Sequence, residues 1–317
     1  MNRTYQIGQP MMKFLGNNKM SPAYKTLFCL IMFILLASTS VAEEVQAIDL
    51  KEIADIAKVP SDLVCPTIVE GAAAAGKRVK DYLPEYKGTK LHHAVYLPTN
   101  WQKNKKYPVI IEYAGNGYSS ERSVLGYGIS GGKDFIWVNM PFVNKDRKSS
   151  TMRWWGDLEA TLAYCKKAVP EICKKYGGDE RKVILAGFSR GSIACNYIGL
   201  YDDEISKLWC AFICHSHYDE RAWAGPTETK TQAACQTRLK RLGNRPQFIS
   251  HERHGTKKYK YRTINTRKTY LRKKQPTGNF TFLTMSFSQH TVDWVMKDIP
   301  ERKTVRQWLK GVLKNIR

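Results

Sequence analysis

Residues 183–191 hold the side chain best placed to do chemistry. They read Val-Ile-Leu-Ala-Gly-Phe-Ser-Arg-Gly, so an apolar strand expected over 183–186 runs into Gly187–Gly191, which matches G-x-S-x-G. A helix is expected over 192–198. A strand, a sharp turn and a helix form the setting that a serine nucleophile requires, because the bend projects the Ser189 hydroxyl clear of the sheet. Glycines beside it leave room for the neighbouring strand and helix. The motif therefore predicts that Ser189 is a nucleophile.

Strands and helices that could position this serine alternate along most of the chain. Strands are expected at 91–98, 109–113, 134–141, 183–186, 208–214, 246–250 and 280–285, and helices at about 157–175, 192–198, 227–242, 263–274 and 301–313. Strand 109–113 is nearly all apolar, as a sheet buried on both faces demands. This order predicts one α/β domain over residues 89–317 with a doubly wound, mostly parallel sheet. Residues 43–88 are expected to form a helical lead-in packed on its core.

From about residue 90 to the C-terminus the chain resembles the α/β-hydrolase superfamily. The resemblance is carried by Gly115-Asn116-Gly117 after a buried strand, by the turn 187–191, and by His290 just after the last strand. Within that superfamily it resembles secreted bacterial serine esterases related to polyester depolymerases and feruloyl-type esterases. The intervals between elements leave no room for a large cap domain, so an open active site is expected.

A serine hydroxyl needs a base to take its proton, and the base needs a carboxylate to hold its tautomer. His290 follows the final strand, where the resemblance implies the base. Histidines before the serine or in other loops are weaker candidates. His215 and His217 could line the site, His251 and His254 are expected at the surface, and His92 and His93 lie in an early strand.

The acid is the least determined member of this set. Glu252 directly follows strand 246–250, the position that most members of the superfamily use. Asp219 follows the preceding strand, a position that a minority use. We favour Glu252, and Asp219 remains the alternative.

Charge that builds on a carbonyl oxygen under attack must meet backbone N–H groups that already point at it. The resemblance implies one such donor at Arg190, after the nucleophile, and another at Asn116 or Gly117. Ala114 stands where histidine is common in this loop, so the choice between Asn116 and Gly117 stays open. Trp154 and Trp155 could form a stacking platform for a substrate, or they could pack in the core. Asp157 beside them is expected to cap the following helix.

The N-terminus carries the features of a secretory signal. Residues 27–37 are apolar, Lys25 precedes them, and Ser40-Val41-Ala42 places small residues at a cleavage point. Eleven apolar residues are few for a membrane span. We therefore expect residues 1–42 to be a signal peptide cut after about Ala42 and the protein to be secreted or periplasmic, without a stable membrane anchor. Seven cysteines remain after that cut, and some of them could pair outside the cytosol.

The chain is strongly basic. Its formal net charge is +23, and loss of residues 1–42 removes four basic residues and no acidic one, which leaves +19. Such a charge favours anionic partners. For an exported protein we favour acidic or sulfated polysaccharide over nucleic acid, with a solvated basic surface as the alternative. Residues 253–274 hold ten basic residues, interleaved tyrosines and no acid, so either explanation applies to them.

These observations predict an exported serine hydrolase that cleaves carboxylic esters, with acylated acidic polysaccharide as the favoured carrier. A serine peptidase of the oligopeptidase type and a non-catalytic exported glycan-binding module are the alternatives. The chain shows no zinc-ligand spacing and no phosphate-cradling glycine loop, so no metal or cofactor is expected. Neither the acyl group, nor the alcohol, nor the oligomeric state follows from the sequence.

Overall fold

A nine-stranded sheet forms the centre of the described chain. The computed structural model describes residues 51–221, 226, 228–253 and 263–316. The strand order is β1-β2-β3-β5-β4-β6-β7-β8-β9. The strands are β1 (Ile68–Val69), β2 (Arg78–Asp81), β3 (His93–Tyr96), β4 (Tyr107–Tyr113), β5 (Ile136–Met140), β6 (Gly178–Phe188), β7 (Ala211–His215), β8 (Gln247–His251) and β9 (Phe280–Thr284).

Parallel pairing dominates this sheet. From β5 through β4, β6, β7 and β8 to β9 every neighbouring pair is parallel. Only β3 pairs antiparallel, with β2 on one side and β5 on the other. Because the carboxyl ends of β6 to β9 meet at one edge, the loops that follow these strands lie close together. The predicted mostly parallel α/β sheet is confirmed.

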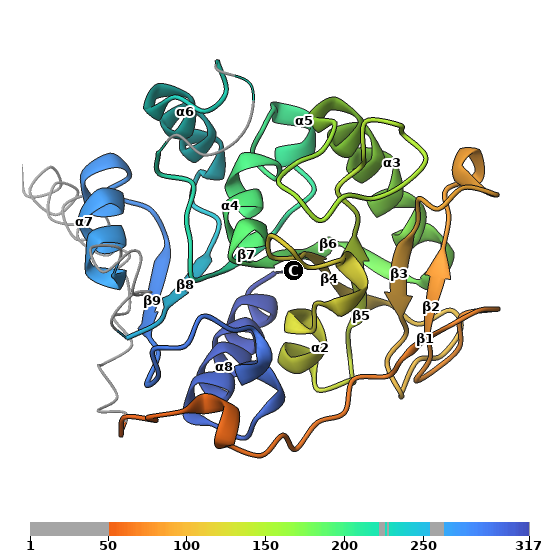
Figure 1. Ribbon diagram of the computed structural model, residues 1–317, viewed down its shortest axis with the longest axis horizontal. Coiled ribbons are helices and arrows are strands. Elements are labelled where there is room, and N and C mark those ends of the chain that lie inside the picture. Colours follow the sequence, from red (N-terminus) through yellow and green to blue (C-terminus); the bar gives the residue numbers. More distant parts are fainter. Residues whose placement is uncertain (1–50, 222–225, 227, 254–262, 317) are drawn as a thin grey trace, which may run out of the picture. The chain divides into compact units, whose positions relative to one another are not determined.

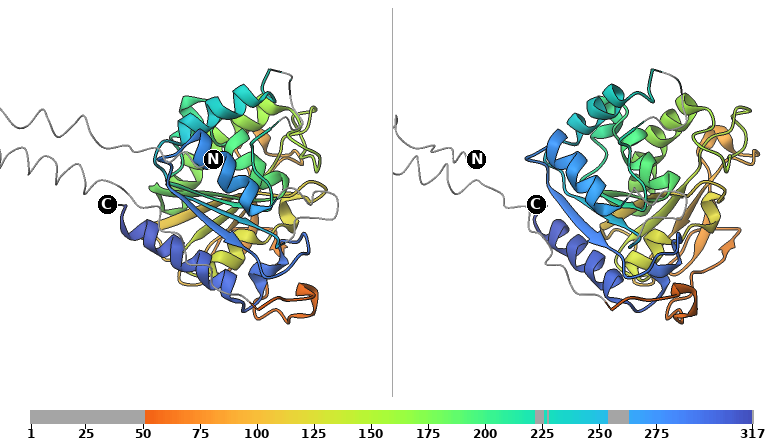
Figure 2. Two further views of the ribbon diagram at one scale, coloured as in Figure 1. Left: turned by 90° about the vertical axis from the view of Figure 1, so that its left-hand side faces the viewer. Right: turned by 60° about the vertical axis from the view of Figure 1, so that its left-hand side comes forward.

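Helices cover both faces of the sheet (Figures 1 and 2). Along β4, Val109, Ile111 and Tyr113 face one hydrophobic core and Ile110 faces the other, as the twofold alternation of a strand requires. The first core is closed by α3 (Leu158–Tyr176), α4 (Arg190–Tyr197), α5 (Asp203–Ser206), α6 (Gln232–Leu242) and α7 (Ile264–Lys274). The second is closed by α2 (Leu125–Ser130) and α8 (Pro300–Lys314). The sheet is therefore doubly wound, and no further domain is inserted among the described residues.

Every strand and helix expected between residues 91 and 313 is present, with ends shifted by a few residues. Helix α3 shows why its ends could be predicted. Asp157 caps it, because its carboxylate accepts a hydrogen bond from the Ala160 N–H at 3.0 Å. Gly177 ends it in the left-handed conformation with φ of 79°, which glycine adopts without steric cost.

Two parts of the fold differ from the sequence-based expectation. The described part of the lead-in, residues 51–88, is not helical beyond single turns, and it contributes strands β1 and β2. Strand β2 pairs with β3 and so covers what would otherwise be an open sheet edge. Helix α2 was not predicted, because its sequence Leu-Gly-Tyr-Gly-Ile-Ser has poor helix propensity. A side chain on Gly126 would lie 2.3 Å from Trp137, so close packing explains that glycine.

Within the described residues no helix is both long enough and apolar enough to cross a membrane. The expected signal peptide, residues 1–42, lies outside the described residues. The seven cysteines of the described part are all free thiols, so no pairing is seen among them.

Candidate active site

Ser189 lies at the sharp turn between β6 and α4. Its φ of 55° and ψ of −116° place it in a strained backbone region that non-glycine residues rarely adopt. A side chain on Gly191 would lie 1.8 Å from the Tyr113 carbonyl oxygen, and one on Gly187 would lie 2.1 Å from the Gly191 backbone. Both glycines of the G-x-S-x-G motif are therefore required by close backbone approach. The strain and the glycines together present the Ser189 hydroxyl above the sheet.

A hydrogen-bonded relay joins this hydroxyl to a buried carboxylate. The His290 Nε2 atom lies 3.0 Å from the Ser189 Oγ atom, and the His290 Nδ1 atom lies 2.8 Å from the Glu252 Oε1 atom. A carboxylate only accepts, so the His290 Nδ1 atom donates to it and the Nε2 atom is left to accept the proton of Ser189. Glu252 is fully buried, whereas the imidazole is 31% exposed. The structure thus brings together three of the predicted residues.

Ser216, which the sequence analysis did not single out, completes the surroundings of the carboxylate. It follows β7 with φ of 83°, another strained position for a non-glycine residue. Its hydroxyl donates to the Glu252 Oε2 atom at 3.0 Å and lies 2.8 Å from the His290 Nδ1 atom. The strain is explained by this placement, because it brings the hydroxyl between the two partners.

Histidines crowd Glu252 and change the protonation of the site. Burial alone would raise the pKa of Glu252, but the hydrogen bond from His290 and the charges that His215 and His251 carry once they are protonated outweigh it, and the pKa lies well below its usual range. Burial lowers the pKa of His215 to about 4 and that of His217 to about 3. Near neutral pH the acid is therefore ionised, and His215 and His217 are uncharged.

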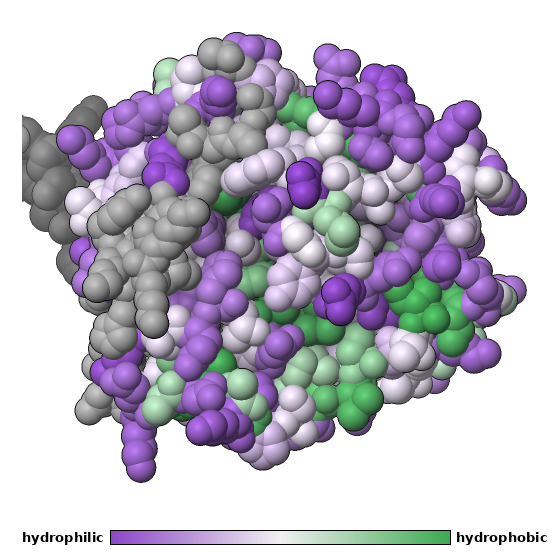
Figure 3. All heavy atoms as spheres, in the orientation of Figure 1, coloured by the Kyte–Doolittle hydropathy of each residue, from purple (hydrophilic) through white to green (hydrophobic). Residues whose placement is uncertain are grey.

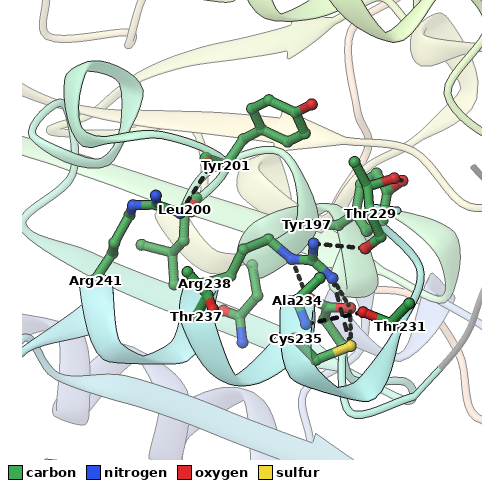
Figure 4. Close-up of polar contacts among 12 residues, drawn as sticks. Tyr197, Leu200, Tyr201, Thr229, Thr231, Ala234, Cys235, Thr237, Arg238 and Arg241 are labelled. Carbon is green, nitrogen blue, oxygen red and sulfur yellow. Dashed lines mark hydrogen bonds and ion pairs between the residues drawn. The ribbon is translucent and has the colours of Figure 1, made fainter. Parts of the chain in front are cut away.

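Asp219, the alternative acid, lies elsewhere. Its carboxylate is fully buried and accepts from the Arg238 Nε atom at 2.6 Å and the Nη2 atom at 3.0 Å. Figure 4 shows the same guanidinium reaching the Thr229 carbonyl, at 2.7 Å, and the Cys235 sulfur. Burial alone would lower the pKa of Arg238, but the hydrogen bond and charge of Asp219 raise it. Asp219 is thus committed to a structural ion pair, which corrects its candidacy as the acid.

The backbone donors for an oxyanion are partly as expected. Arg190 is the first residue of α4, where a helix leaves the N–H without an intrahelical acceptor. The Gly117 N–H donates to the Met152 carbonyl at 2.7 Å, so Gly117 is not available, and this candidate was wrong. Asn116 remains as the second candidate, and its side-chain oxygen accepts from the Trp154 N–H at 3.0 Å. A side chain on Gly115 would lie 3.5 Å from the Ser189 Cβ atom, so this loop borders the serine.

The side chain of Arg190 holds this loop in place, a role that the sequence did not indicate. The side chain is buried, and its guanidinium donates to the carbonyls of Ala114 at 3.3 Å, Gly115 at 3.0 Å and Trp154 at 2.9 Å. None of the described carboxylates forms an ion pair with it. Burial accordingly lowers the pKa of Arg190 to about 9. One side chain therefore connects the turn that holds Ser189 to both loops beside it.

The two tryptophans have different surroundings. Trp155 is buried and stacks on Tyr197 with ring centroids 4.6 Å apart and an interplanar angle of 13°, so it belongs to the core and its candidacy as a substrate platform is corrected. Trp154 is only partly buried and contacts the Asn116 and Arg190 side chains through its backbone. Only Trp154 remains a candidate for substrate contact.

Three further expectations concern residues away from the serine. His251 was expected at the surface but is buried, with its Nδ1 atom 3.0 Å from Glu252. His93 is buried against Tyr164, and His254 lies outside the described residues. Residues 254–262 of the basic stretch also lie outside them, and Arg267 within α7 is buried in an ion pair with Glu220. No group of three possible metal ligands is found among the described residues.

Comparisons with known proteins bear on the fold. The chain is similar to the feruloyl esterase module from Clostridium thermocellum, a serine-to-alanine mutant complexed with sinapinate, with a TM-score of 0.52 and 17% identity over 80% of this chain and 95% of that chain. The protein has the α/β-hydrolase fold. A second similar structure, of FAE, gives a TM-score of 0.50 and 17% identity over 75% and 92% of the two chains. The structure of TT1662 from Thermus thermophilus is also similar, with a TM-score of 0.50 and 13% identity over 71% of this chain and 94% of that chain.

No family model and no curated protein matches the sequence. Within the α/β-hydrolase fold, Ser189 follows β6, Glu252 follows β8 and His290 follows β9. This is the chain order Ser, Asp or Glu, and His that is typical of the fold. The resemblance inferred from the sequence is therefore confirmed at the level of fold.

Proposed function

We propose that this protein is an exported serine hydrolase that cleaves carboxylic esters, with acylated acidic polysaccharide as its substrate class. The observation that carries the proposal is the relay from the Ser189 Oγ atom to His290 at 3.0 Å and from His290 to Glu252 at 2.8 Å. Feruloyl esterases among the similar structures support ester hydrolysis as the reaction. The intact relay favours catalysis over a non-catalytic glycan-binding module.

The reaction follows from the geometry. The Ser189 oxygen attacks the ester carbonyl carbon while the His290 Nε2 atom takes its proton. The N–H groups of Arg190 and Asn116 stabilise the charge on the carbonyl oxygen. The imidazolium then protonates the leaving alcohol, and an acyl group remains on Ser189. Water, deprotonated by His290, releases the acid and restores the serine. Glu252 stays ionised throughout and holds the imidazole in its orientation.

Exposed apolar side chains on the loop that borders the serine, and on the loop hydrogen-bonded to it, would fit an apolar acyl group. Tyr118 is 40% exposed and Met152 is 51% exposed. Both belong to the loops that flank Asn116, because the Gly117 N–H donates to the Met152 carbonyl. An apolar acyl chain or ring at this position would be removed from water, at about 25 cal/mol per Å². The proposed ester thus combines an apolar acyl group with an anionic carrier.

The test compares purified wild-type protein with Ser189→Ala on a panel of p-nitrophenyl esters and peptide p-nitroanilides. We expect ester turnover by the wild type, loss by about 10⁴-fold or more in Ser189→Ala, and no anilide turnover. Ser130→Ala is the matched control, since its hydroxyl donates to the Tyr127 carbonyl and accepts from the Gly132 N–H and has no described contact with Ser189, His290 or Glu252. A fluorophosphonate probe should label the wild type alone. Preferred cleavage of anilides would favour the peptidase, and an inert, unlabelled wild type would refute the hydrolase.

Export is the part of the proposal that rests on sequence alone. N-terminal sequencing of protein recovered from the periplasm or medium should give a chain that begins near Glu43. Recovery in the membrane fraction of a chain that retains residues 27–37 would show instead that this segment anchors the protein in a membrane.

A further inference from the structure

A lysine-lined cavity lies on the described part of the chain, away from the serine. It has a volume of about 830 Å³, which suits a ligand of several rings. We call this cavity the lysine pocket, because six lysines line it: Lys80, Lys103, Lys105, Lys106, Lys174 and Lys175. Only one of the described acidic residues, Asp81, lines the same cavity.

The lysine pocket and Ser189 lie at opposite ends of strand β4. Lys105 and Lys106 precede the first residue of β4, whereas the loop that borders Ser189 follows its last residue, Tyr113. Seven residues of strand span about 20 Å at about 3.3 Å per residue. The pocket is therefore not part of the hydrolytic site.

The lysines come from three separate segments, so no single structural need explains them. Lys174 and Lys175 lie in the last turn of α3, where cations stabilise a helix terminus. Lys80 on β2 forms an ion pair with Glu70 at 3.0 Å, and Lys175 forms one with Asp81 at 2.7 Å. Neither explanation extends to Lys103 and Lys105 in the turn before β4. The described contacts give Lys103 and Lys174 no carboxylate partner, so their charges are available to a ligand.

The remaining walls supply apolar and aromatic surface. Ala72, Ala73 and Val79 line the pocket together with Trp101, whose indole N–H donates to the Tyr176 carbonyl at 2.9 Å. Figure 3 shows hydrophobic residues gathered over β1 and β2, between hydrophilic ones. A fixed indole next to cationic side chains can contact the apolar face of a sugar ring while the lysines neutralise its acidic groups.

A second cavity lies next to the first. Its volume is about 620 Å³, and it shares Asp81, Lys174 and Lys175 with the lysine pocket while adding one basic residue, Lys87, and one acidic residue, Glu171. Two adjacent cavities suit an extended chain better than a compact ion. Among the described residues that line them there is no arginine, the residue favoured for bidentate phosphate contact.

We propose that the lysine pocket binds a segment of acidic polysaccharide, with carboxylate or sulfate groups on the lysines and one sugar ring against Trp101. The choice of a glycan as the anion rests on the proposed function, because it would be the carrier of the ester. The anion site itself rests only on the pocket. In this proposal, part of the net charge of +19 binds the polysaccharide at a distance from Ser189.

The test measures binding without turnover, in the full mature chain with Ser189→Ala. The probe is a fluorescent hexamer of galacturonic acid, with a sulfated heparin hexamer as a second probe and a neutral glucose hexamer as a blank. The pocket variant is Lys103→Gln/Lys105→Gln/Lys174→Gln, all exposed side chains. The matched control, Lys58→Gln/Lys310→Gln/Lys314→Gln, removes the same charge from exposed positions that line neither cavity.

We expect at least about a tenfold rise in Kd for an acidic hexamer in the pocket variant and less than a twofold rise in the control. Equal losses in both variants, or none in either, would overturn the site. Tighter binding of a charge-matched single-stranded DNA, lost in the same pocket variant, would overturn the glycan assignment. The pocket variant with Ser189 intact should hydrolyse a small neutral ester normally, so failure of the hydrolase and failure of the pocket are distinguishable.

Discussion

The guanidinium carbon of Arg190 lies 3.9 Å from the centroid of the Phe142 ring. A cation over an aromatic face is attracted by the ring, and the attraction is stronger when both are removed from water. This contact, with the carbonyls of Ala114, Gly115 and Trp154, stabilises a buried charge that has no carboxylate partner among the described residues. The residue proposed to offer a backbone N–H to the oxyanion thus also holds the loop of the second proposed donor.

Replacement of Arg190 should therefore reduce kcat more than it changes KM. In Arg190→Met the backbone N–H remains, but the loop 114–118 loses its tether, and we expect kcat to fall by about 10²-fold, comparable to loss of one oxyanion donor. Arg190→Lys should recover little of this, since an ammonium cannot reach three carbonyls in a fork. Steady-state kinetics on a small neutral ester test the idea. An unchanged kcat in both variants would show that the loop holds its position without the side chain.

The two buried carboxylates should separate into a catalytic and a structural role. Glu252→Gln should lower kcat by about 10³- to 10⁴-fold even in the folded fraction, because the amide no longer holds the His290 tautomer. Asp219→Asn should cost about 3–5 kcal/mol of unfolding free energy by leaving Arg238 without its partner, while the folded fraction keeps its kcat. Urea unfolding and active-site titration of each variant decide this, and the reverse pattern would reassign the acid.

Ser216 should contribute both orientation and strain. Ser216→Ala and Ser216→Gly both remove the hydroxyl that donates to Glu252, and each should lower kcat by about tenfold, the usual worth of a hydrogen bond to a charged group. They differ in stability, because glycine tolerates the φ of 83°. We expect the glycine variant to be more stable than the alanine variant by about 1 kcal/mol in thermal unfolding. Equal stabilities would mean that the backbone relaxes once the hydroxyl is gone.

Stability should fall between pH 6.5 and pH 4 because of the buried histidines. His215 has a pKa lowered to about 4 by burial, so the folded chain does not take up the proton that the unfolded chain binds below pH 6.5. Each pKa unit corresponds to about 1.4 kcal/mol, which gives a loss of about 3 kcal/mol from this residue alone. Glu252 has a lowered pKa and adds its own loss only below about pH 4.5. His215→Gln should flatten the curve of unfolding free energy between pH 6.5 and 4, and an unchanged slope would contradict the assignment.

Ser189 and His290 could be found from the sequence because each is fixed by a local pattern. The serine follows a short apolar strand and precedes a helix, and the histidine follows the last apolar strand. The choice between Glu252 and Asp219 could not be made in this way, because both follow neighbouring parallel strands and so reach the same edge of the sheet. What separates them is Arg238, nineteen residues beyond Asp219 on α6, and no local pattern pairs those two residues.

The remaining differences have similar causes. Strand β2 is short and mixes charged with apolar residues, so it forms only because β3 offers an edge to pair with, and the two-residue β1 pairs with β2 in turn. The sequence indicated no role for the Arg190 side chain, since nothing local shows that three carbonyls from two distant loops surround it. His251 was expected at the surface because the basic residues after it suggested a loop, whereas it ends β8 and packs against Glu252. In each case contacts between distant residues decided the outcome.

The separation of about 20 Å between the two ends of β4 also sets a length requirement on any polymer that occupies the lysine pocket and reaches Ser189 at once. A polymer shorter than this path can occupy either the lysine pocket or the region of Ser189 but not both, so its affinities for the two sites are independent. A longer, flexible chain that rounds the edge of the sheet would present its acyl groups to the serine at an effective concentration near the millimolar range. Such a chain could be retained after one ester is cut while the next is drawn in, so the protein would deacylate long polymers repeatedly and short ones singly.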